Sequence, residues 1–149
     1  MDNKFMEAAL IEAKKAFDKK ETPVGAVIVK DGKIISRAHN MRETNKNALM
    51  HAEITAIDKA CKKLGGWRLC GCDIYVSLEP CPMCAGAIIG ARIDNVFFGA
   101  YDKKAGAFGS VCDLSGLFAH KVNASGGIYE KESSDILKLF FEKLRKKEI

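Results

Sequence analysis

The chain has 149 residues, of which 48% are hydrophobic and 29% charged, and a formal net charge of +5. A chain of this size fits one domain, residues 1–149, and can bury roughly two thirds of the surface that its unfolded form exposes. No apolar run approaches the ~18 residues that a membrane span needs, and the first residues lack an apolar signal core. We therefore expect a cytoplasmic protein whose six cysteines stay reduced.

Helix and strand patterns alternate along the N-terminal half. Residues 3–20 carry apolar side chains at helical spacing and predict an amphipathic helix. Strands are predicted at residues 24–29 and 33–37, and Asp31-Gly32 between them is typical of a hairpin turn. A second helix is predicted from His51 to Leu64, where two glycines end it. Its predicted inward face consists of Ile54, Ile57, Cys61 and Leu64.

The alternation continues after this helix. Residues 73–78 predict a third strand and residues 95–99 a fourth. Between them, residues 81–92 predict a helix that begins directly after Pro80, and its apolar content indicates burial against the sheet.

The rest of the chain has a weaker pattern. Residues 100–127 are rich in glycine and small residues, and we expect an active-site loop with a short helix that cannot be placed. Residues 128–129 are expected to belong to a fifth strand, and residues 135–147 to a closing helix. That helix is predicted to face inward with Ile136, Leu139, Phe140 and Leu144. The alternation predicts a three-layer α/β/α sandwich with a mixed five-stranded sheet.

The segment His51-Ala52-Glu53, followed by Pro80-Cys81-Pro82-Met83-Cys84, has the residue types of a catalytic zinc site. Structural zinc sites fill four positions with cysteine and histidine, whereas catalytic sites use three protein ligands and leave the fourth position for water. His51, Cys81 and Cys84 are the candidate ligands. The start of a helix favours the thiolate form that zinc requires, and cysteines three residues apart share a helix face.

Glu53 lies two residues past the candidate histidine ligand and is the candidate catalytic base. It could accept a proton from a zinc-activated water and return it to the leaving group. A carboxylate at a helix start is also common without any catalytic role, and a histidine or a cysteine pair alone is more often structural. Their combination favours hydrolytic chemistry.

A competing structural zinc site would join Cys70 and Cys72 to Cys81 and Cys84. The strand-like run between the two pairs argues against it, because about nine extended residues at ~3.3 Å each separate the pairs by more than ~20 Å.

These motifs resemble those of the zinc nucleobase deaminases, the cytidine deaminase-like superfamily, in which His-x-Glu precedes Pro-Cys-x-x-Cys. The resemblance extends through Thr22 to Val29, Leu78-Glu79-Pro80, Cys84 to Ala87, Phe98-Gly99-Ala100 and Ala107 to Ser110, nearly the whole chain. Within the superfamily the chain is most similar to the bacterial enzymes that convert the wobble adenosine of an arginine tRNA anticodon to inosine.

The resemblance implies further roles. Asn40 matches a position whose side chain hydrogen-bonds the target base, Asp102 a loop position near the bound nucleotide, and Phe141 a C-terminal aromatic beside the flipped anticodon base. It also implies one Zn²⁺ per subunit and a homodimer, for which the apolar helix around residues 85–89 is a candidate contact. Residues 138–149 carry five basic against two acidic side chains, and this end could meet phosphate, although most short basic runs are solvated helix ends.

Two departures keep an alternative open. Residues 47–50 differ from the sequence usual before the histidine in tRNA enzymes, and Pro82 is typical of free-base deaminases. A guanine or cytosine deaminase is therefore the second hypothesis. A non-catalytic, zinc-stabilised RNA-binding subunit is the third, and Glu53 argues against it because such a subunit needs no free carboxylate beside the metal.

Overall fold

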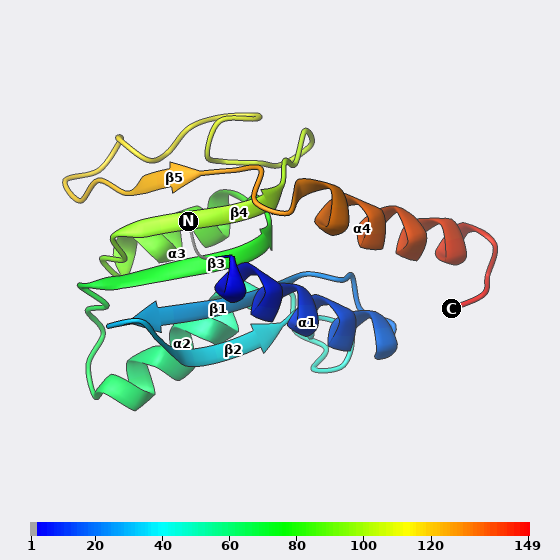
Figure 1. The fold of residues 1–149 in the computed structure, drawn as a ribbon, viewed down its shortest axis with the longest axis horizontal. Coiled ribbons are helices and arrows are strands. Elements are labelled where there is room, and N and C mark those ends of the chain that lie inside the picture. The colour runs from blue at the N-terminus through cyan, green and yellow to red at the C-terminus, as the bar shows by residue number, and fades with distance from the viewer. Residues whose placement is uncertain (1–2) are drawn as a thin grey trace.

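The computed structural model describes residues 3–149, which form one mixed sheet with helices on both faces (Figure 1). In chain order the elements are α1 (Lys4–Asp18), β1 (Gly25–Lys30), β2 (Lys33–His39), α2 (Ala52–Leu64), β3 (Cys72–Leu78), α3 (Pro82–Gly90), β4 (Asn95–Ala100), β5 (Asn123–Ser125) and α4 (Glu130–Arg145). Within this range, no helix is both long and apolar enough to cross a bilayer.

The strands lie in the order β2-β1-β3-β4-β5. β1 pairs antiparallel with β2 and with β3, whereas β3, β4 and β5 are parallel. Because β3 and β4 run in the same direction, the loops that follow them leave the sheet at the same end. β2 ends and β1 begins at that end as well. The residues that flank these four strands therefore lie at the same end of the sheet.

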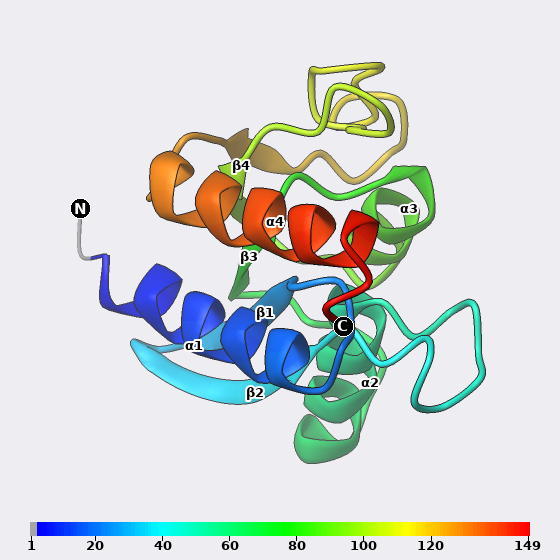
Figure 2. The same cartoon turned by 90° about the vertical axis from the view of Figure 1, so that its right-hand side faces the viewer.

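The molecule has three layers (Figure 2). α1 and α4 cover one face of the sheet, and α2 and α3 cover the other. The larger apolar core lies between the sheet and the α2/α3 layer, and a smaller one, including Met6, Val27 and Tyr75, lies under α1. The predicted α/β/α sandwich with a mixed five-stranded sheet is confirmed.

Local sequence explains several element boundaries. Asp31 and Gly32 both have positive φ angles, 51° and 74°, which is the backbone of the predicted hairpin turn. Gly65 adopts the left-handed conformation and ends α2, as predicted. At Gly25 a Cβ atom would collide with the backbone of α1, so glycine lets this helix approach the sheet closely.

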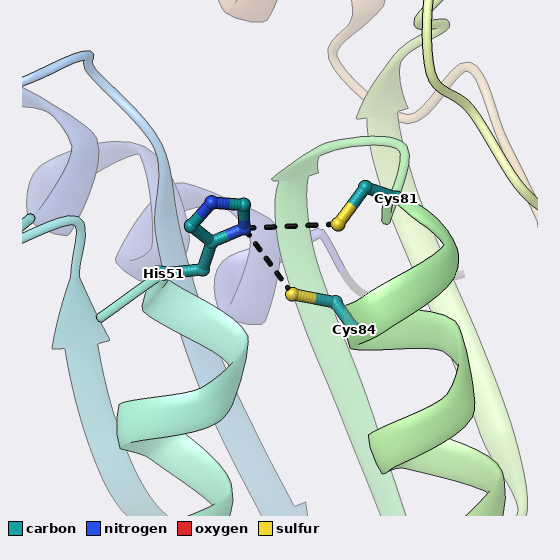
Figure 3. A group of neighbouring side chains, drawn as sticks. All are labelled: His51, Cys81 and Cys84. Atoms are coloured by element: carbon teal, nitrogen blue, oxygen red, sulfur yellow. Dashed lines mark hydrogen bonds between the residues drawn. The ribbon is translucent and has the colours of Figure 1, made fainter. Parts of the chain in front are cut away.

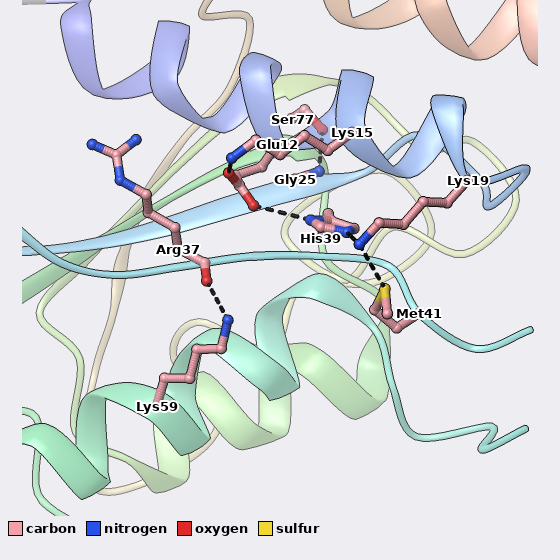
Figure 4. Close-up of polar contacts among 9 residues, drawn as sticks. All are labelled: Glu12, Lys15, Lys19, Gly25, Arg37, His39, Met41, Lys59 and Ser77. Atoms are coloured by element: carbon pink, nitrogen blue, oxygen red, sulfur yellow. Dashed lines mark hydrogen bonds and ion pairs between the residues drawn. The ribbon is translucent and has the colours of Figure 1, made fainter. Parts of the chain in front are cut away.

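Polar contacts join α1, the β1–β2 hairpin and α2 (Figure 4). His39, at the end of β2, faces Glu12 of α1 through Nδ1 at 3.0 Å and accepts a hydrogen bond from Lys19 through Nε2 at 3.1 Å. The Nζ of Lys59 on α2 donates to the carbonyl of Arg37 at 2.9 Å. His39 therefore connects the end of β2 to α1.

The fifth strand was predicted in the wrong place. It comprises Asn123–Ser125, and residues 128–129 instead form the turn before α4, where Tyr129 has a φ of 55°. The short helix expected within residues 100–127 is also wrong, because this described segment contains turns, one isolated bridge and β5. Asn, Ala and Ser are weak strand formers, so pairing with β4 rather than propensity creates this strand.

Two predicted helix faces need correction. The fully buried side of α2 consists of Ala52, Glu53, Ala56 and Ala60. The predicted Ile54, Ile57 and Cys61 are only partly buried, and Leu64 is exposed. On α4, which begins at Glu130 rather than residue 135, Phe140 is buried as predicted but Leu139 and Leu144 are exposed. Small alanines let α2 pack closely on the sheet, so the larger side chains lie at its margins.

Candidate metal centre and active-site cavity

His51, Cys81 and Cys84 lie together at the starts of two neighbouring helices (Figure 3). The Nδ1 atom of His51 is 3.7 Å from the Sγ of Cys81 and 3.4 Å from the Sγ of Cys84. The three potential ligand atoms all lie within 4.8 Å of one another. These residues, predicted from sequence spacing, could hold a metal ion.

The fold places the cluster at two helix starts. His51 is the N-cap of α2 and Cys81 is the N-cap of α3, with Pro82 at the first position of that helix. The unpaired backbone N–H groups of a helix start carry partial positive charge, which favours an anionic sulfur there. Both helix starts therefore direct their positive ends at the cluster.

The close contacts within the cluster shift the pKa values of its three side chains. Hydrogen bonds from Cys84 and then from His51 lower the pKa of Cys81 to about 3, whereas the hydrogen bond to Cys81 and burial raise the pKa of Cys84. The hydrogen bond to Cys81 raises the pKa of His51. These contacts favour the thiolate form of Cys81. This is the anionic sulfur that a metal ion would bind.

Glu53 is the second residue of α2, two positions past His51. It is buried, with 4% of its surface exposed, and burial raises its pKa to about 6. The Glu53 carboxyl lies close enough to Cys84 to share a hydrogen bond with it. A carboxyl whose pKa is near neutrality can both accept and donate a proton at physiological pH.

A cavity of about 180 Å³ opens beside the cluster, and it is bordered by residues from five segments of the chain. This volume is smaller than the ~300 Å³ at which pockets for drug-sized ligands begin, which suits one planar base. His51, Glu53, Cys81, Asn40 and Asp102 all border it. The structure thus brings five of the seven predicted site residues to one cavity, with Cys84 buried directly behind.

Asn40 and Asp102 enter the cavity from loops that are held by hydrogen bonds. The side-chain amide of Asn40 donates to the carbonyl of Thr22 at 3.4 Å, and its Oδ1 accepts the backbone N–H of Arg42 at 3.3 Å. The Oδ1 of Asp102 accepts the N–H groups of Lys104 and Ala105 at 3.0 and 3.1 Å. Asp102 is therefore fixed by its own loop, and Asn40 by its own loop and by the segment between α1 and β1.

Phe141 lies outside the cavity, in a wider groove of about 830 Å³ that shares Thr22, Arg42, Leu78 and Asp102 with it. We call it the basic groove because it contains four basic residues and only two acidic ones, Asp102 and Glu130. Its basic members are Arg42, Lys103, Lys104 and Lys138. Tyr101 and Phe141 add exposed aromatic side chains to it.

The residues that differ from the pattern of the tRNA enzymes do not border the cavity. Residues 47–50 are absent from its border, and their loop projects into solvent. Pro82 is exposed at the first turn of α3, where its fixed φ suits a helix start. Residues 47–50 and Pro82 therefore lie outside the cavity border.

Sequence reasoning missed several residues of the site. Arg42 and Ala105 border the cavity, and Glu79 lies at its edge with a buried carboxylate. The only signal for Glu79 was its place directly before Pro80-Cys81. Cys72 lies at the opposite end of β3 from the cluster, and among the described residues only His51, Cys81 and Cys84 form a possible metal-binding group. The competing four-cysteine site is therefore not formed.

The chain belongs to the MafB19-like deaminase family, whose sequence model matches residues 1–145. Deaminases are hydrolases, and the chain is an enzyme of that class. It is 49% identical to the tRNA-specific adenosine deaminase of Bacillus subtilis (strain 168) over 148 residues, covering 98% of this chain and 92% of the relative.

Solved structures agree with this assignment. A structure from a study of A-to-I editing by tRNA:A34 deaminases at the wobble position of transfer RNA is 42% identical, with a TM-score of 0.85, over 91% of this chain and all of the other. The guanine deaminase of Bacillus subtilis is 46% identical, with a TM-score of 0.65, over 68% of this chain and 66% of that one. The expected cytidine deaminase-like fold is thereby confirmed.

Proposed function

We propose that this protein is a tRNA-specific adenosine deaminase that converts the wobble adenosine of an arginine tRNA anticodon to inosine. The observation that carries the proposal is the cavity, which places three metal-ligand side chains and a buried carboxylate around a space fit for one base. The near full-length similarity to a tRNA-specific adenosine deaminase supports it. A tRNA substrate would place the protein in the cytoplasm.

The donor set fits zinc. Two sulfur atoms and one imidazole are ligands that zinc prefers, and three protein ligands leave a position for water, as in catalytic sites. We therefore propose that His51, Cys81 and Cys84 hold one Zn²⁺ per subunit. When bound, zinc lowers the pKa of a coordinated water and so supplies a nucleophile near neutral pH.

Glu53 would move the protons of the reaction. It accepts a proton from the attacking water and delivers it to ring N1, and it then takes the proton of the new C6 hydroxyl and gives it to the departing amine. The C6–O bond forms, the C6–N bond breaks, and water plus adenosine gives inosine plus ammonia. The raised pKa of Glu53, caused by its burial, suits both directions of transfer.

The remaining predicted residues would bind the RNA. Asn40 and Asp102 border the cavity and would contact the base. The basic groove continues from the cavity and would accept the neighbouring nucleotides, with lysines for phosphate and Phe141 for stacking. A base in an anticodon loop can be extruded at modest cost, which a cavity closed around one base requires.

A free-nucleobase deaminase is the second candidate function. The 46% identity to a guanine deaminase supports it, although that likeness covers only 68% of this chain. The basic groove favours RNA, because a free base needs no cationic surface outside the cavity. A non-catalytic RNA-binding subunit is the weakest candidate, since it gives no reason for burying Glu53 at the cavity.

The test is a comparison of substrates with the zinc-loaded protein. An arginine tRNA anticodon stem-loop with adenosine at the wobble position is incubated beside free adenine, guanine and cytosine, and inosine and ammonia are measured. We expect inosine from the stem-loop and no ammonia from the free bases. Ammonia from guanine alone would assign the protein to free-base deamination, and the Glu53→Gln variant would exclude a contaminating deaminase in either case.

A homodimer is also part of the proposal, and it rests on the resemblance. Within α3, Ala85, Ile88 and Ile89 are buried in the core of the subunit itself. The surface available for contact is the outer side of α3 at Gly86 and Gly90, next to the exposed Phe118. Light scattering after size exclusion should give twice the mass of the chain, and a Phe118→Asp variant should give a smaller particle. A wild-type particle with the mass of one chain would contradict the dimer.

A further inference from the structure

Glu79, the last residue before Pro80-Cys81, has a carboxylate buried inside the protein, with 1% of the residue exposed. In the described part of the chain no basic side chain forms an ion pair with it. A buried carboxylate without a cation is costly unless hydrogen bonds replace its lost water. The partners that replace this water all come from one loop.

The two carboxylate oxygens of Glu79 accept four hydrogen bonds from residues 102–110. Oε1 accepts the backbone N–H of Asp102 at 3.1 Å and the hydroxyl of Ser110. Oε2 accepts the backbone N–H groups of Phe108 and Ser110, each at 3.1 Å. The loop contains neither helix nor regular strand, so these bonds are a main source of its order.

Gly106 shows how closely the loop wraps the carboxylate. A Cβ atom at this position would collide with the carboxylate carbon and both oxygens of Glu79. Pro80, the residue after Glu79, also holds the loop, because its carbonyl accepts the N–H of Ala107 at 2.9 Å. Glu79 and Pro80 thus connect the end of β3 to the N-cap Cys81 and also hold the loop.

We propose that Glu79 is a positioning residue for the base: its carboxylate holds loop 102–110 against the cavity and thereby fixes Asp102 at the cavity wall. Asp102 and Ala105 of this loop border the cavity, and the backbone of Asp102 is bonded directly to Glu79. The inference rests on the proposed deaminase function of the cavity. It assigns Glu79 no contact with the reacting atoms.

Replacing Glu79 by glutamine should break one hydrogen bond in particular, the one from the backbone N–H of Asp102. The amide oxygen can stay at the Oε2 position and keep the two bonds from Phe108 and Ser110. The amide NH₂ then occupies the Oε1 position, where the Ser110 hydroxyl can turn and accept, but the N–H of Asp102 meets another donor. A Ser110→Ala variant removes one bond and leaves the other three, so its effect should be smaller.

The experiment compares wild type, Glu79→Gln and Ser110→Ala, with Glu12→Gln as the matched control. Glu12 is also a buried carboxylate, but its partners Lys15 and His39 do not border the cavity. Zinc content, kcat and KM on the stem-loop, and hydrogen exchange of residues 102–112 are measured well below each Tm. A displaced active-site group can cost up to about 100-fold in rate, so we expect kcat/KM of Glu79→Gln to fall ~10- to 100-fold.

In Glu79→Gln, zinc content should be unchanged and exchange should accelerate only in residues 102–112. Glu12→Gln should lose thermal stability without this pattern. Combining Glu79→Gln with Asp102→Asn should then cost less than the product of the two single losses, because the first change acts through the residue that the second removes. A purely structural role of Glu79 would give multiplying losses.

Wild-type kcat/KM in Glu79→Gln, unchanged exchange in residues 102–112, or multiplying losses would overturn the inference. If Glu79→Gln does not fold, exchange in Ser110→Ala decides whether the carboxylate holds the loop. If wild type deaminates guanine instead of RNA, the proposed function fails, and the same comparison is made with guanine. The exchange measurement needs no substrate, so the two failures are distinguishable.

Discussion

Glu53 and Glu79 both border the cavity, yet their carboxylates have different surroundings. Burial raises the pKa of Glu53 to about 6, whereas Glu79 is surrounded by four hydrogen-bond donors from one loop. A group that exchanges protons needs a pKa near the working pH, and a group that anchors a loop needs fixed donors. The two residues suit proton transfer and positioning, respectively.

The role of Glu53 predicts the behaviour of its glutamine variant. Glu53→Gln keeps the size of the side chain and leaves His51, Cys81 and Cys84 intact, so zinc content by mass spectrometry should stay at one per chain. General acid–base catalysis contributes about 10²- to 10⁴-fold, and we expect kcat on the stem-loop to fall by that factor. Equal turnover in the two proteins would remove Glu53 from the mechanism.

The candidate ligands could be predicted from sequence because their chemistry lies in short, local motifs. Glu79 could not, because its partners Asp102 and Ser110 lie 23 and 31 residues further along the chain, in a loop without a regular pattern. A glutamate after a strand is ordinarily solvated. Only the folded loop reveals that this one is enclosed.

α4 carries the side chain that we propose to distinguish RNA from a free base. Phe141 projects from α4 into the basic groove, whereas Leu139 on the same helix is similarly exposed but does not border it. Stacking of a base on an aromatic ring is worth about 1–3 kcal/mol. Phe141→Ala should therefore raise KM for the stem-loop by roughly 5- to 150-fold. Leu139→Ala should not, and equal effects of the two variants would exclude a stacking role.

The loop between β2 and α2 is held by another buried carboxylate, Glu21, which accepts the N–H groups of Glu43 and Thr44 at 3.1 and 2.6 Å. Burial opposes ionisation of Glu21, but hydrogen bonds from Thr44 and Glu43 outweigh it and lower its pKa from the ordinary value of 4.5. A carboxyl with a lowered pKa in the folded state stabilises the protein above its unfolded pKa, and the stabilisation is lost as the pH falls through the folded pKa.

Glu21→Gln should consequently be less stable than wild type at pH 7, and the difference should shrink below about pH 4.5. Thermal unfolding of both proteins between pH 7 and pH 3 measures this difference. Other acid-sensitive groups are common to both proteins and cancel. A difference in Tm that stays constant over the whole range would show that ionised Glu21 contributes nothing.

Long periodic elements were easier to predict than short ones. α1 and the β1–β2 hairpin were found close to their bounds because periodicity and turn chemistry specify them locally. β5, with Asn123, Ala124 and Ser125, has little strand propensity and exists through pairing with β4. The start of α4 was predicted five residues too late, although Glu130 and Glu132 complement the positive end of its dipole.

The site depends on strand order, which the alternation of elements does not determine. β1 lies between β2 and β3, so the end of β2, the start of β1 and the end of β3 converge, and β4 adds its following loop beside them. Asn40, Val24, Cys81 and Asp102 reach one cavity for this reason. The sequence motifs indicated the candidate residues, and the sheet topology explains why they meet.

The metal would connect the starts of α2 and α3, but neither helix depends on it for burial. Ala52 and Ala56 of α2 and Ala85 and Ile88 of α3 belong to the same large apolar core. Chelation of the metal should therefore leave the far-UV circular dichroism unchanged. The apo protein should melt at a lower temperature, because a ligand at 100 times its Kd stabilises by about 2.7 kcal/mol, roughly 5–10 °C for a chain of this length.

Adding one equivalent of zinc should restore the Tm of the apo protein. A Cys84→Ser variant should not respond to zinc, whereas Cys70→Ser, which changes an exposed cysteine outside the cluster, should respond like wild type. Loss of the helical signal on chelation would contradict this expectation and make the metal a folding element. Retention of the fold would mean that the core alone holds the two helix starts together, so that the ligands are arranged before the metal arrives.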